Sequence, residues 1–456
     1  MFLQQHFPFA PQAKPIRRSY IQPQSVLRQW APCIAMLLLG FLSYVDRSVL
    51  AILSPTILAD LHLSATQYGY AILVFSLCYM LANPIWGFWM DRAGLWLTTL
   101  AAVLVWSIAS GSHGLMLGFL SLCLARGVLG FGEGATFPAG LKTVTETLPA
   151  SKRSFGLGIA YSGSSLGAAI TPLLITPIAV RYGWRYAFAL TAFFGLAWIA
   201  LWLLLQATGW YATKPSTAAP DPEIELIASS QTPNQISRWN RNLFAAASVY
   251  GLGAAPLAFG LYAAPLYLTH VLHLSQTSLG HLLWLPPAGW EAGYLFFGHI
   301  ADRRRQHDAA SNRISQPGRR PGPLFLLFSI AGFLITLAPA AAASPYPLAA
   351  TMLLFFLQMF LAGGFVVFSL SDGMATLPRQ HSAFLAGICI SAWALVTGVL
   401  MPILGHFFDH GRYTLTFWIV ACLPPLGTLL WKLLSSTPTV SSPDEFRNHP
   451  LPLESK

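Results

Sequence analysis

Long apolar runs follow one another along almost the whole chain. A helix that crosses a bilayer needs about 20 mostly apolar residues, and the 456-residue sequence contains roughly twelve such runs. Hydrophobic residues make up 55% of the chain and charged residues only 9%, whereas a soluble domain carries about 25% charged residues. The sequence therefore predicts an all-α membrane protein with twelve transmembrane helices. These expected helices span residues 31–57, 68–90, 97–112, 115–141, 155–180, 184–206, 243–267, 279–301, 324–341, 348–372, 384–408 and 414–434.

A polar segment over residues 209–240 divides these runs into two groups of six. It contains four prolines and an acidic cluster, a composition typical of a flexible linker. The expected organisation is a cytoplasmic N-terminal segment (1–30), a six-helix half (31–208), the cytoplasmic linker, a second six-helix half (241–435) and a cytoplasmic tail (436–456). The first segment lacks the apolar stretch and cleavage site of a signal peptide, so residue 31 onward is expected to form the first helix.

Positive charge is unevenly distributed over the loops. If both termini are cytoplasmic, the cytoplasmic segments hold 21 of the 26 Lys and Arg residues. The opposite side holds Arg181, Arg185 and Arg412, while Arg47 and Arg126 lie inside expected helices. Lys and Arg accumulate in the cytoplasmic loops of membrane proteins, so we expect both termini in the cytoplasm. This arrangement describes a multi-pass protein of the plasma membrane, which is the inner membrane of a Gram-negative cell.

A short motif occurs once in each half. Gly87 to Arg92 closes the second expected helix, and Gly298 to Arg303 closes the eighth, 211 residues later. Repeated halves in a twelve-helix chain are typical of transporters that rock around a site between the halves.

In the first half, four charged residues lie deep inside expected membrane helices: Asp46, Arg47, Arg126 and Glu133. A charge at the bilayer centre costs about 2.5–3.5 kcal/mol even on the gentlest scale, so such residues usually mark a substrate or ion path. Two acids and two arginines are what proton-coupled movement of an organic anion needs. Arg126 and Glu133 share a helix face but lie about 10.5 Å apart along the axis. A direct bond between them requires both side chains to extend toward each other. Alternatively, each pairs with a residue on another helix, as Arg126 would with Asp46.

The loop after the second helix resembles the signature of the major facilitator superfamily, G-x-x-x-D-R-x-G followed by basic residues. Leu95 and Trp96 stand at the basic positions. The resemblance implies a gating motif that latches one transport state; charges that only set topology are the alternative. The expected gating residues are Gly87, Asp91, Arg92, Gly94 and, in the second copy, Gly298, Asp302 and Arg303.

Further motifs lie in five segments: Tyr44 to Arg47, Phe75 to Tyr79, Asn83-Pro84, Arg126 to Pro138 and Ser162 to Gly167. These segments are similar to the anion:cation symporter family, and within it to proton symporters of hexuronates and galactonate. The resemblance extends from Tyr44 to about Leu205, whereas the second half matches this branch poorly. Val49 and Asn83 depart from the family's usual Asn and Gln.

Arg47 is the first candidate for binding a substrate carboxylate. Its planar guanidinium can form two parallel hydrogen bonds with a carboxylate and stays charged at physiological pH. A structural partnership with Asp46 or another acid is the alternative. Tyr44 and Tyr79 are expected to donate hydrogen bonds to the substrate, as the family resemblance implies, with helix packing as their alternative role.

Asp46 and Glu133 are the candidate proton carriers, and Arg126 is expected to bias them. Burial favours the protonated form of a carboxyl group, whereas a nearby arginine favours the ionised form. This competition can poise an acid to exchange a proton when its surroundings rearrange. A permanent ion-paired network without proton exchange is the alternative.

The second half offers Glu291 and Trp393 as substrate-binding candidates. Glu291 is an isolated acid inside an expected helix, which favours a functional role, although a structural hydrogen bond explains it equally well. The histidines have no metal-ligand spacing and the chain has no P-loop, so we expect no metal, no cofactor, no nucleic acid and no enzymatic activity.

The leading hypothesis is a monomeric secondary transporter in the lipid bilayer that moves a small organic anion, such as a hexuronate or aldonate, together with protons by alternating access. An organic-anion exchanger or a drug exporter of the same fold is the alternative. A non-transporting membrane sensor is a second alternative.

Overall fold

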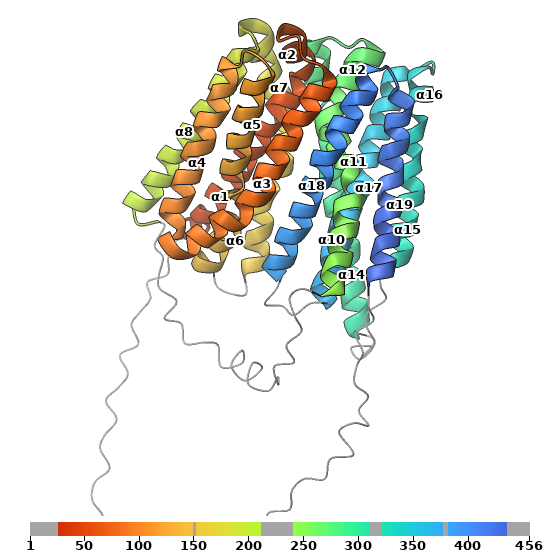
Figure 1. Ribbon diagram of the computed structural model, residues 1–456. Coiled ribbons are helices and arrows are strands. Elements are labelled where there is room, and N and C mark those ends of the chain that lie inside the picture. The colour runs from red at the N-terminus through yellow and green to blue at the C-terminus, as the bar shows by residue number, and fades with distance from the viewer. Residues whose placement is uncertain (1–25, 149–151, 211–239, 311–320, 377–381, 436–456) are drawn as a thin grey trace, which may run out of the picture.

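The computed structural model describes residues 26–148, 152–210, 240–310, 321–376 and 382–435. Every regular element in these ranges is a helix, and the helices run side by side as one bundle (Figure 1). Most of the expected N-terminal segment (to residue 25), residues 211–239 of the linker and the tail from residue 436 lie outside the described residues.

The helices before the linker pack together on one side of the bundle, and those after it on the other (Figure 1). The first group contains α1 (Val26–Ile52), α2 (Ser54–Asp60), α3 (Ala65–Ala93), α4 (Leu95–Ser112), η1 (His113–Leu115), α5 (Phe119–Glu133), α6 (Thr136–Thr147), α7 (Arg153–Tyr182) and α8 (Trp184–Ala207). The second group contains α10 (Arg241–Gly253), α11 (Ala255–Ala258), η3 (Phe259–Ala263), α12 (Ala264–Leu272), α13 (Gln276–Leu282), α14 (Leu285–Ala310), α15 (Gly322–Gly332), η5 (Phe333–Leu337), α16 (Ala338–Ala342), α17 (Pro347–Thr376), α18 (Ser382–Asp409) and α19 (Tyr413–Leu434).

Ten stretches of helix within the described residues are long and apolar enough to cross a membrane. The all-α membrane fold is therefore confirmed. Of the twelve expected spans, ten match these stretches. The other two, residues 115–141 and 279–301, are each divided, into α5 and α6 and into α13 and α14. Neither α5, with 15 residues, nor α6, with 12, is long enough by itself to cross a bilayer, and α14 carries Glu291 and a run of charged residues towards its end.

Prolines explain where two expected helices are interrupted. The first was expected to continue to residue 57, but α1 ends at Ile52 and α2 begins at Ser54, because Pro55 has no backbone N–H to donate. Pro286 and Pro287 likewise fall in the first turn of α14, where a missing N–H costs nothing.

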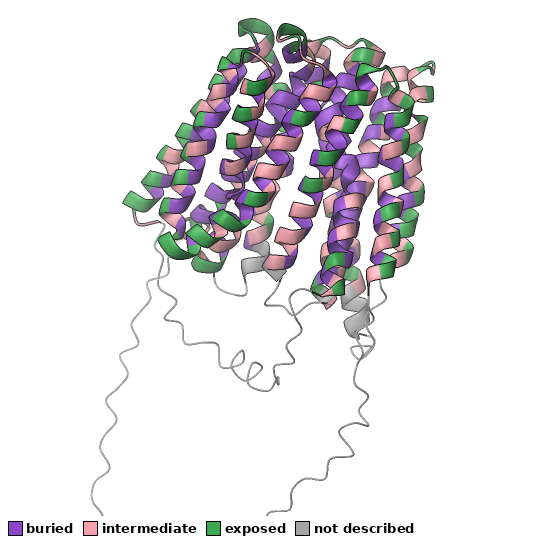
Figure 2. Ribbon diagram, viewed as in Figure 1, coloured by how far each residue is buried: buried purple, intermediate pink, exposed green. Residues whose placement is uncertain are grey.

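Burial follows the arrangement expected for a bundle in lipid. Buried positions face the interior of the bundle and exposed positions its outer surface (Figure 2). Many exposed positions are large and apolar, for example Ile108, Leu120 and Phe193. Apolar side chains on the outer surface contact lipid and not water, so their exposure carries no hydrophobic penalty. Packing between the helices therefore depends on close van der Waals fit and on hydrogen bonds inside the bundle.

Glycines allow α5 to pack tightly against its neighbours. A methyl group on Gly130 would collide with the Phe75 carbonyl of α3, and one on Gly132 would collide with Trp106 of α4. Because only glycine permits this approach, α5 brings Glu133 into the interior of the first group, where its side chain is fully buried.

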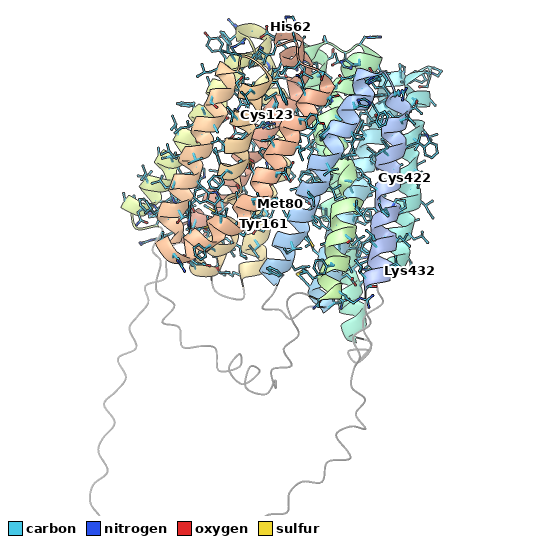
Figure 3. All side chains as sticks on the ribbon, viewed as in Figure 1. His62, Met80, Cys123, Tyr161, Cys422 and Lys432 are labelled. Carbon is cyan, nitrogen blue, oxygen red and sulfur yellow. The ribbon has the colours of Figure 1, made fainter. Side chains whose placement is uncertain are left out.

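The two groups are hydrogen-bonded to each other at one end of the bundle, which we call the His62 end; Lys432 marks the opposite end (Figure 3). The Asp409 carboxylate at the end of α18 accepts bonds from the backbone N–H groups of Ala65 (2.7 Å) and Thr66 (2.9 Å) at the start of α3. Gln276 of α13 accepts a bond from the Thr56 hydroxyl (2.9 Å) and donates one to the Ile52 carbonyl (3.0 Å).

Candidate functional site

A buried ion pair between α1 and α5 forms the centre of the candidate site. Arg47 Nε donates to Glu133 Oε2 at 2.5 Å, and the Ser43 hydroxyl donates to the same oxygen at 2.8 Å. Ser43 and Arg47 lie one turn apart on α1, so both face α5. Arg47 is 4% exposed and Glu133 0% exposed. Burial makes such a pair costly to break, because either ion alone would be left uncompensated.

Aromatic rings surround the Arg47 guanidinium. Its Cζ atom lies 4.3 Å from the ring centroid of Tyr79, 5.0 Å from that of Tyr44 and 5.1 Å from that of Phe75. A cation this close to ring faces is attracted by the π electrons. Tyr44 and Tyr79, both expected at the substrate site, are therefore next to Arg47, and Phe75 joins them from α3.

Arg126 lies beside this pair without an ion-pair partner among the described residues. Its Nη2 donates to the Arg47 carbonyl at 3.4 Å, and its Cζ lies 5.3 Å from the Phe75 ring. Nε and Nη1 of this 1% exposed side chain find no hydrogen-bond acceptor in the described part of the chain. The direct bonds considered from the sequence, to Glu133 or to Asp46, are not formed; Glu133 bonds Arg47 instead.

Asp46 faces a different set of helices from its neighbour Arg47. The Ser110 hydroxyl of α4 donates to Asp46 Oδ1 at 2.5 Å, and Asp46 is 2% exposed. Consecutive residues of a helix point about 100° apart, which explains why Arg47 meets α3 and α5 while Asp46 meets α4. The two candidate proton carriers are thus held by separate partners: Glu133 by an arginine, Asp46 by a hydroxyl.

The second group reaches the site through Trp290 of α14. Its ring centroid lies 5.7 Å from that of Tyr44 and 5.3 Å from that of Tyr294, and its indole N–H finds no acceptor among the described residues. The adjacent Glu291 is half-buried and forms no hydrogen bond or ion pair within the described ranges. Trp393 donates its indole N–H to the Ala254 carbonyl at 3.1 Å. This N–H therefore already has an acceptor within the second helix group.

The expected gating residues lie near the Lys432 end, where a cavity of about 330 Å³ is lined by residues of α3, α4, α6 and α8. Asp91 Oδ1 accepts a bond from Lys142 Nζ of α6 at 2.5 Å, so a cation from another helix pairs with the motif whose own basic position is missing. Gly94 has φ of 86°, a backbone conformation that favours glycine.

The remaining expected gating residues form no ion pair within the described part of the chain. Arg92 lies over the Phe88 ring at 4.2 Å. In the second copy Gly298 lies within α14 and Arg303 is exposed, whereas the side chain of Asp302 lies outside the described residues.

Several residues of the site were not predicted. Ser43, Ser110, Trp290 and Lys142 contact the predicted residues, but serine and tryptophan are common in membrane helices and Lys142 resembled an ordinary loop charge. Among these four residues, Ser43 could have been found from the sequence, because it lies one turn before Arg47 and therefore on the same helix face.

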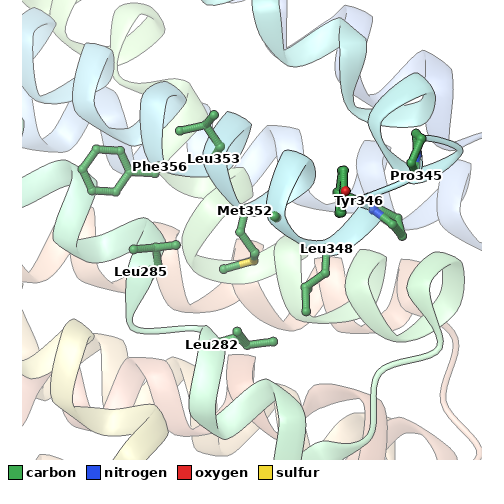
Figure 4. A pocket seen from close by; sticks show the side chains of 10 residues that line it. Leu282, Leu285, Pro345, Tyr346, Leu348, Met352, Leu353 and Phe356 are labelled. Atoms are coloured by element: carbon green, nitrogen blue, oxygen red, sulfur yellow. The ribbon is translucent and has the colours of Figure 1, made fainter.

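A second cavity has a different character. This groove of about 780 Å³ lies between α13, α14 and the start of α17, and apolar residues line most of it (Figure 4). It shares no residue with the charged site. No group of three His, Cys, Asp or Glu residues within the described ranges is arranged to hold a metal ion.

Comparison with known proteins found a family and individual transporters that the chain resembles. The sequence profile of the Major Facilitator Superfamily matches residues 36–370. The hexuronate transporter of Escherichia coli (strain K12) is 26% identical over 438 residues, covering 92% of this chain and 97% of that protein. The hexuronate transporter of Bacillus subtilis (strain 168) is 40% identical over 172 residues, covering 38% of this chain and 41% of that protein.

A solved structure shares the fold. A bacterial homologue of the human lysosomal transporter Spinster, in an inward-facing and occupied conformation, matches with a TM-score of 0.69 and 17% identity, covering 91% of this chain and 98% of that chain. The family profile and the sequence relatives confirm the resemblance to superfamily transporters of sugar acids. They also confirm the expectation that the chain is not an enzyme, because these relatives are transporters.

Proposed function

The chain belongs to the major facilitator superfamily of membrane transporters, and we propose that it moves a sugar-acid anion across the plasma membrane together with protons. The observation that carries this proposal is the Arg47–Glu133 pair, fully enclosed and ringed by aromatic side chains. The names of the two hexuronate transporters support the substrate class.

Arg47 is suited to bind the substrate carboxylate. Glu133 occupies its Nε edge, and the two terminal nitrogens form no hydrogen bond with the described residues. A guanidinium presents a second edge to a carboxylate, while Tyr44 and Tyr79 offer hydroxyls and ring faces to the sugar body. Trp290 adds an unused N–H from the second group.

Competition for Arg47 supplies a coupling mechanism. The ionised Glu133 holds Arg47, and a substrate carboxylate competes for the same cation. Protonation removes the charge of Glu133, which weakens its hold and leaves Arg47 to the substrate. A proton and an anion then enter together, and Asp46 provides a second protonation site nearby.

Alternating access follows from rocking of the two helix groups. The six-helix halves, 31–208 and 241–435, are the proposed moving units, with the substrate between Arg47 and Trp290. The gating motif around Asp91 is the proposed latch at the Lys432 end. Positive-inside charge distribution supports cytoplasmic termini, and we propose a monomer in a bacterial inner membrane.

The test is uptake of labelled glucuronate or galacturonate into proteoliposomes under an imposed pH gradient. Uptake is expected to rise with an inward proton gradient, and internal pH to fall with substrate. The double variant Asp46→Asn/Glu133→Gln should lose gradient-driven uptake while retaining substrate binding in a thermal-shift assay, since a bound ligand raises apparent stability. Substrate-dependent proton movement that survives in the double variant would overturn the coupling assignment, and proton-independent counterflow in the wild type would identify an exchanger.

A further inference from the structure

We propose that Ser110 and Thr191 position Asp46 for proton exchange by hydrogen-bonding it in both its ionised and its protonated form. This inference rests on the proposed proton coupling and adds two positioning residues to it. Both hydroxyls lie on helices other than α1 and α5, which carry the four charged residues of the site.

Three short contacts run in line from Asp46 to a backbone carbonyl. Asp46 Oδ1 lies 2.5 Å from the Ser110 hydroxyl of α4, which lies 2.7 Å from the Thr191 hydroxyl of α8. Thr191 Oγ1 lies 3.0 Å from the Phe188 carbonyl oxygen. Asp46 is 2% exposed and both hydroxyl residues are 1% exposed, so the line is closed off from solvent.

Counting hydrogens shows that this line accommodates both forms of Asp46. Each hydroxyl has one hydrogen and two lone pairs. With Asp46 ionised, Thr191 donates to Ser110 and Ser110 donates to the carboxylate. With Asp46 protonated, its O–H donates to Ser110, Ser110 donates to Thr191, and Thr191 donates to the Phe188 carbonyl, which accepts a second bond beside its helical one.

The change between the two forms needs little reorganisation. One proton from the aqueous phase forms a new O–H bond on Asp46, and the two hydroxyl hydrogens rotate to their other acceptors. No heavy atom has to move and no other covalent bond changes. A fixed donor such as an amide N–H could not accept a bond from the O–H of the protonated acid, and a fixed acceptor could not donate to the carboxylate.

Other ionisable groups near this line set the background against which Asp46 takes up its proton. Arg126 and Glu133 of α5 act on Asp46, and His113 of η1, one turn beyond Ser110, bonds the Ala109 carbonyl through Nδ1 at 2.7 Å. Among the described side chains, the remaining ionisable groups on α1 and the elements packed against it are Arg28, Cys33, Tyr44 and Arg47 on α1 itself, Asp60 on α2, Lys142 and Glu146 on α6, Tyr161, Arg181 and Tyr182 on α7, Arg185 and Tyr186 on α8, and Tyr262 on η3.

Two variants are expected to affect the ionised and the protonated forms of Asp46 differently. Thr191→Val removes the Ser110–Thr191 bond from both forms. In the ionised form the Ser110 hydrogen keeps its acceptor, the Asp46 carboxylate, whereas in the protonated form the Ser110 hydrogen is left without the acceptor that Thr191 provides. Thr191→Val is therefore expected to move the pH of half-maximal proton-driven uptake to lower pH, by about one unit if one hydrogen bond is lost. Ser110→Ala removes a bond from both forms, so it should lower maximal uptake with a smaller shift of that pH.

Matched controls exclude a general packing effect. Thr191→Ser restores the hydroxyl and should restore the wild-type pH profile. Ser107→Ala removes a buried hydroxyl one turn earlier on α4, where Ser107 bonds the Val103 carbonyl at 2.7 Å, and should leave the profile unchanged.

Infrared difference spectroscopy of the purified protein gives a readout independent of transport. The carboxylic acid C=O band that disappears in Asp46→Asn is expected to appear at lower pH in Thr191→Val than in the wild type. An identical titration of this band in wild type and Thr191→Val would overturn the inference while leaving the proposed function intact. Absence of any proton-coupled uptake in the wild type would instead overturn the proposed function, and this inference with it.

Discussion

Arg47 shows at the scale of one residue how a membrane interior tolerates a charge and uses it. Its Nε is bonded to Glu133 and its plane lies among the rings of Tyr44, Phe75 and Tyr79. These contacts compensate the loss of hydration and fix the direction of the guanidinium. A lysine keeps the charge but lacks the planar fork and the extended π contact.

Arg47→Lys is therefore expected to weaken substrate binding about ten- to hundredfold, because hydrogen bonds to charged groups contribute about 1.5–3 kcal/mol. Titration of the thermal shift with hexuronate measures the affinity. Arg185→Lys is the matched control, since Arg185 pairs with Asp60 at 3.1 Å on the surface and should bind substrate normally. Wild-type affinity in Arg47→Lys would exclude Arg47 as the carboxylate ligand.

At the scale of elements, the end of α18 caps the start of α3. Besides its two backbone bonds, Asp409 accepts a bond from the Thr66 hydroxyl at 2.5 Å. The first N–H groups of a helix have no partner within the helix, and a carboxylate there also interacts favourably with the helix dipole. Since α3 and α18 belong to different helix groups, this cap holds the groups together only while the His62 end is closed.

Asp409→Asn is expected to favour opening of the His62 end. Loss of a cap and its charge costs about 0.5–2 kcal/mol, which corresponds to a shift of about two- to thirtyfold in the ratio of closed to open molecules. Spin labels at Leu117 and Tyr346, exposed residues near this end, measure the shift as a longer distance population.

Asp60→Asn serves as the control for that experiment. Asp60 lies at the same end, but its carboxylate accepts bonds from Trp184 and Arg185 of its own helix group. An equal distance change in both variants, or none in Asp409→Asn, would contradict a gating role for Asp409.

At the scale of the whole molecule, transport by rocking requires the His62 end to open. Thr56 and Gln276 face each other across the two groups at this end. In a background without the five native cysteines, Thr56→Cys and Gln276→Cys joined by a short bis-methanethiosulfonate linker should reduce uptake at least tenfold, and dithiothreitol should restore it.

A cross-link within one group provides the comparison. Ser275 and Ser278 have hydroxyls 3.0 Å apart beside and within α13, so the same linker between cysteines there should leave uptake unchanged. Undiminished uptake by fully cross-linked Thr56→Cys/Gln276→Cys protein would exclude opening at this end as part of the cycle.

Helix positions were largely predictable, whereas helix interruptions were only partly so. Residues 97–112 and 184–206 were expected as helices and form α4 and α8 with ends shifted by at most two residues. Pro55 and Pro286 mark two interruptions in the sequence itself. The π-helical turn η3 (Phe259–Ala263) is likewise followed by a proline, Pro265 in the first turn of α12, but the expected helix over residues 243–267 continued through it.

The partners of the charged residues could not be read from spacing. Arg126 and Glu133 share a helix face, yet Glu133 bonds Arg47, 86 residues away in the chain. The Asp46–Ser110 contact spans 64 residues, and Asp91 finds Lys142 on another helix. Each pairing depends on the rotation of one helix against the next.

The apolar helices, the family that they resemble and the four charges within the first half could all be read from the sequence alone. Those properties are local: in lipid, a segment must satisfy its backbone hydrogen bonds internally, so each apolar run becomes a helix regardless of its neighbours. That Arg47 bonds Glu133, that the Ser110 hydroxyl bonds Asp46 and that Asp409 joins the two groups became visible only in the folded bundle. Side-chain bonds between helices depend on close packing and axial rotation, and these are properties of the assembled bundle.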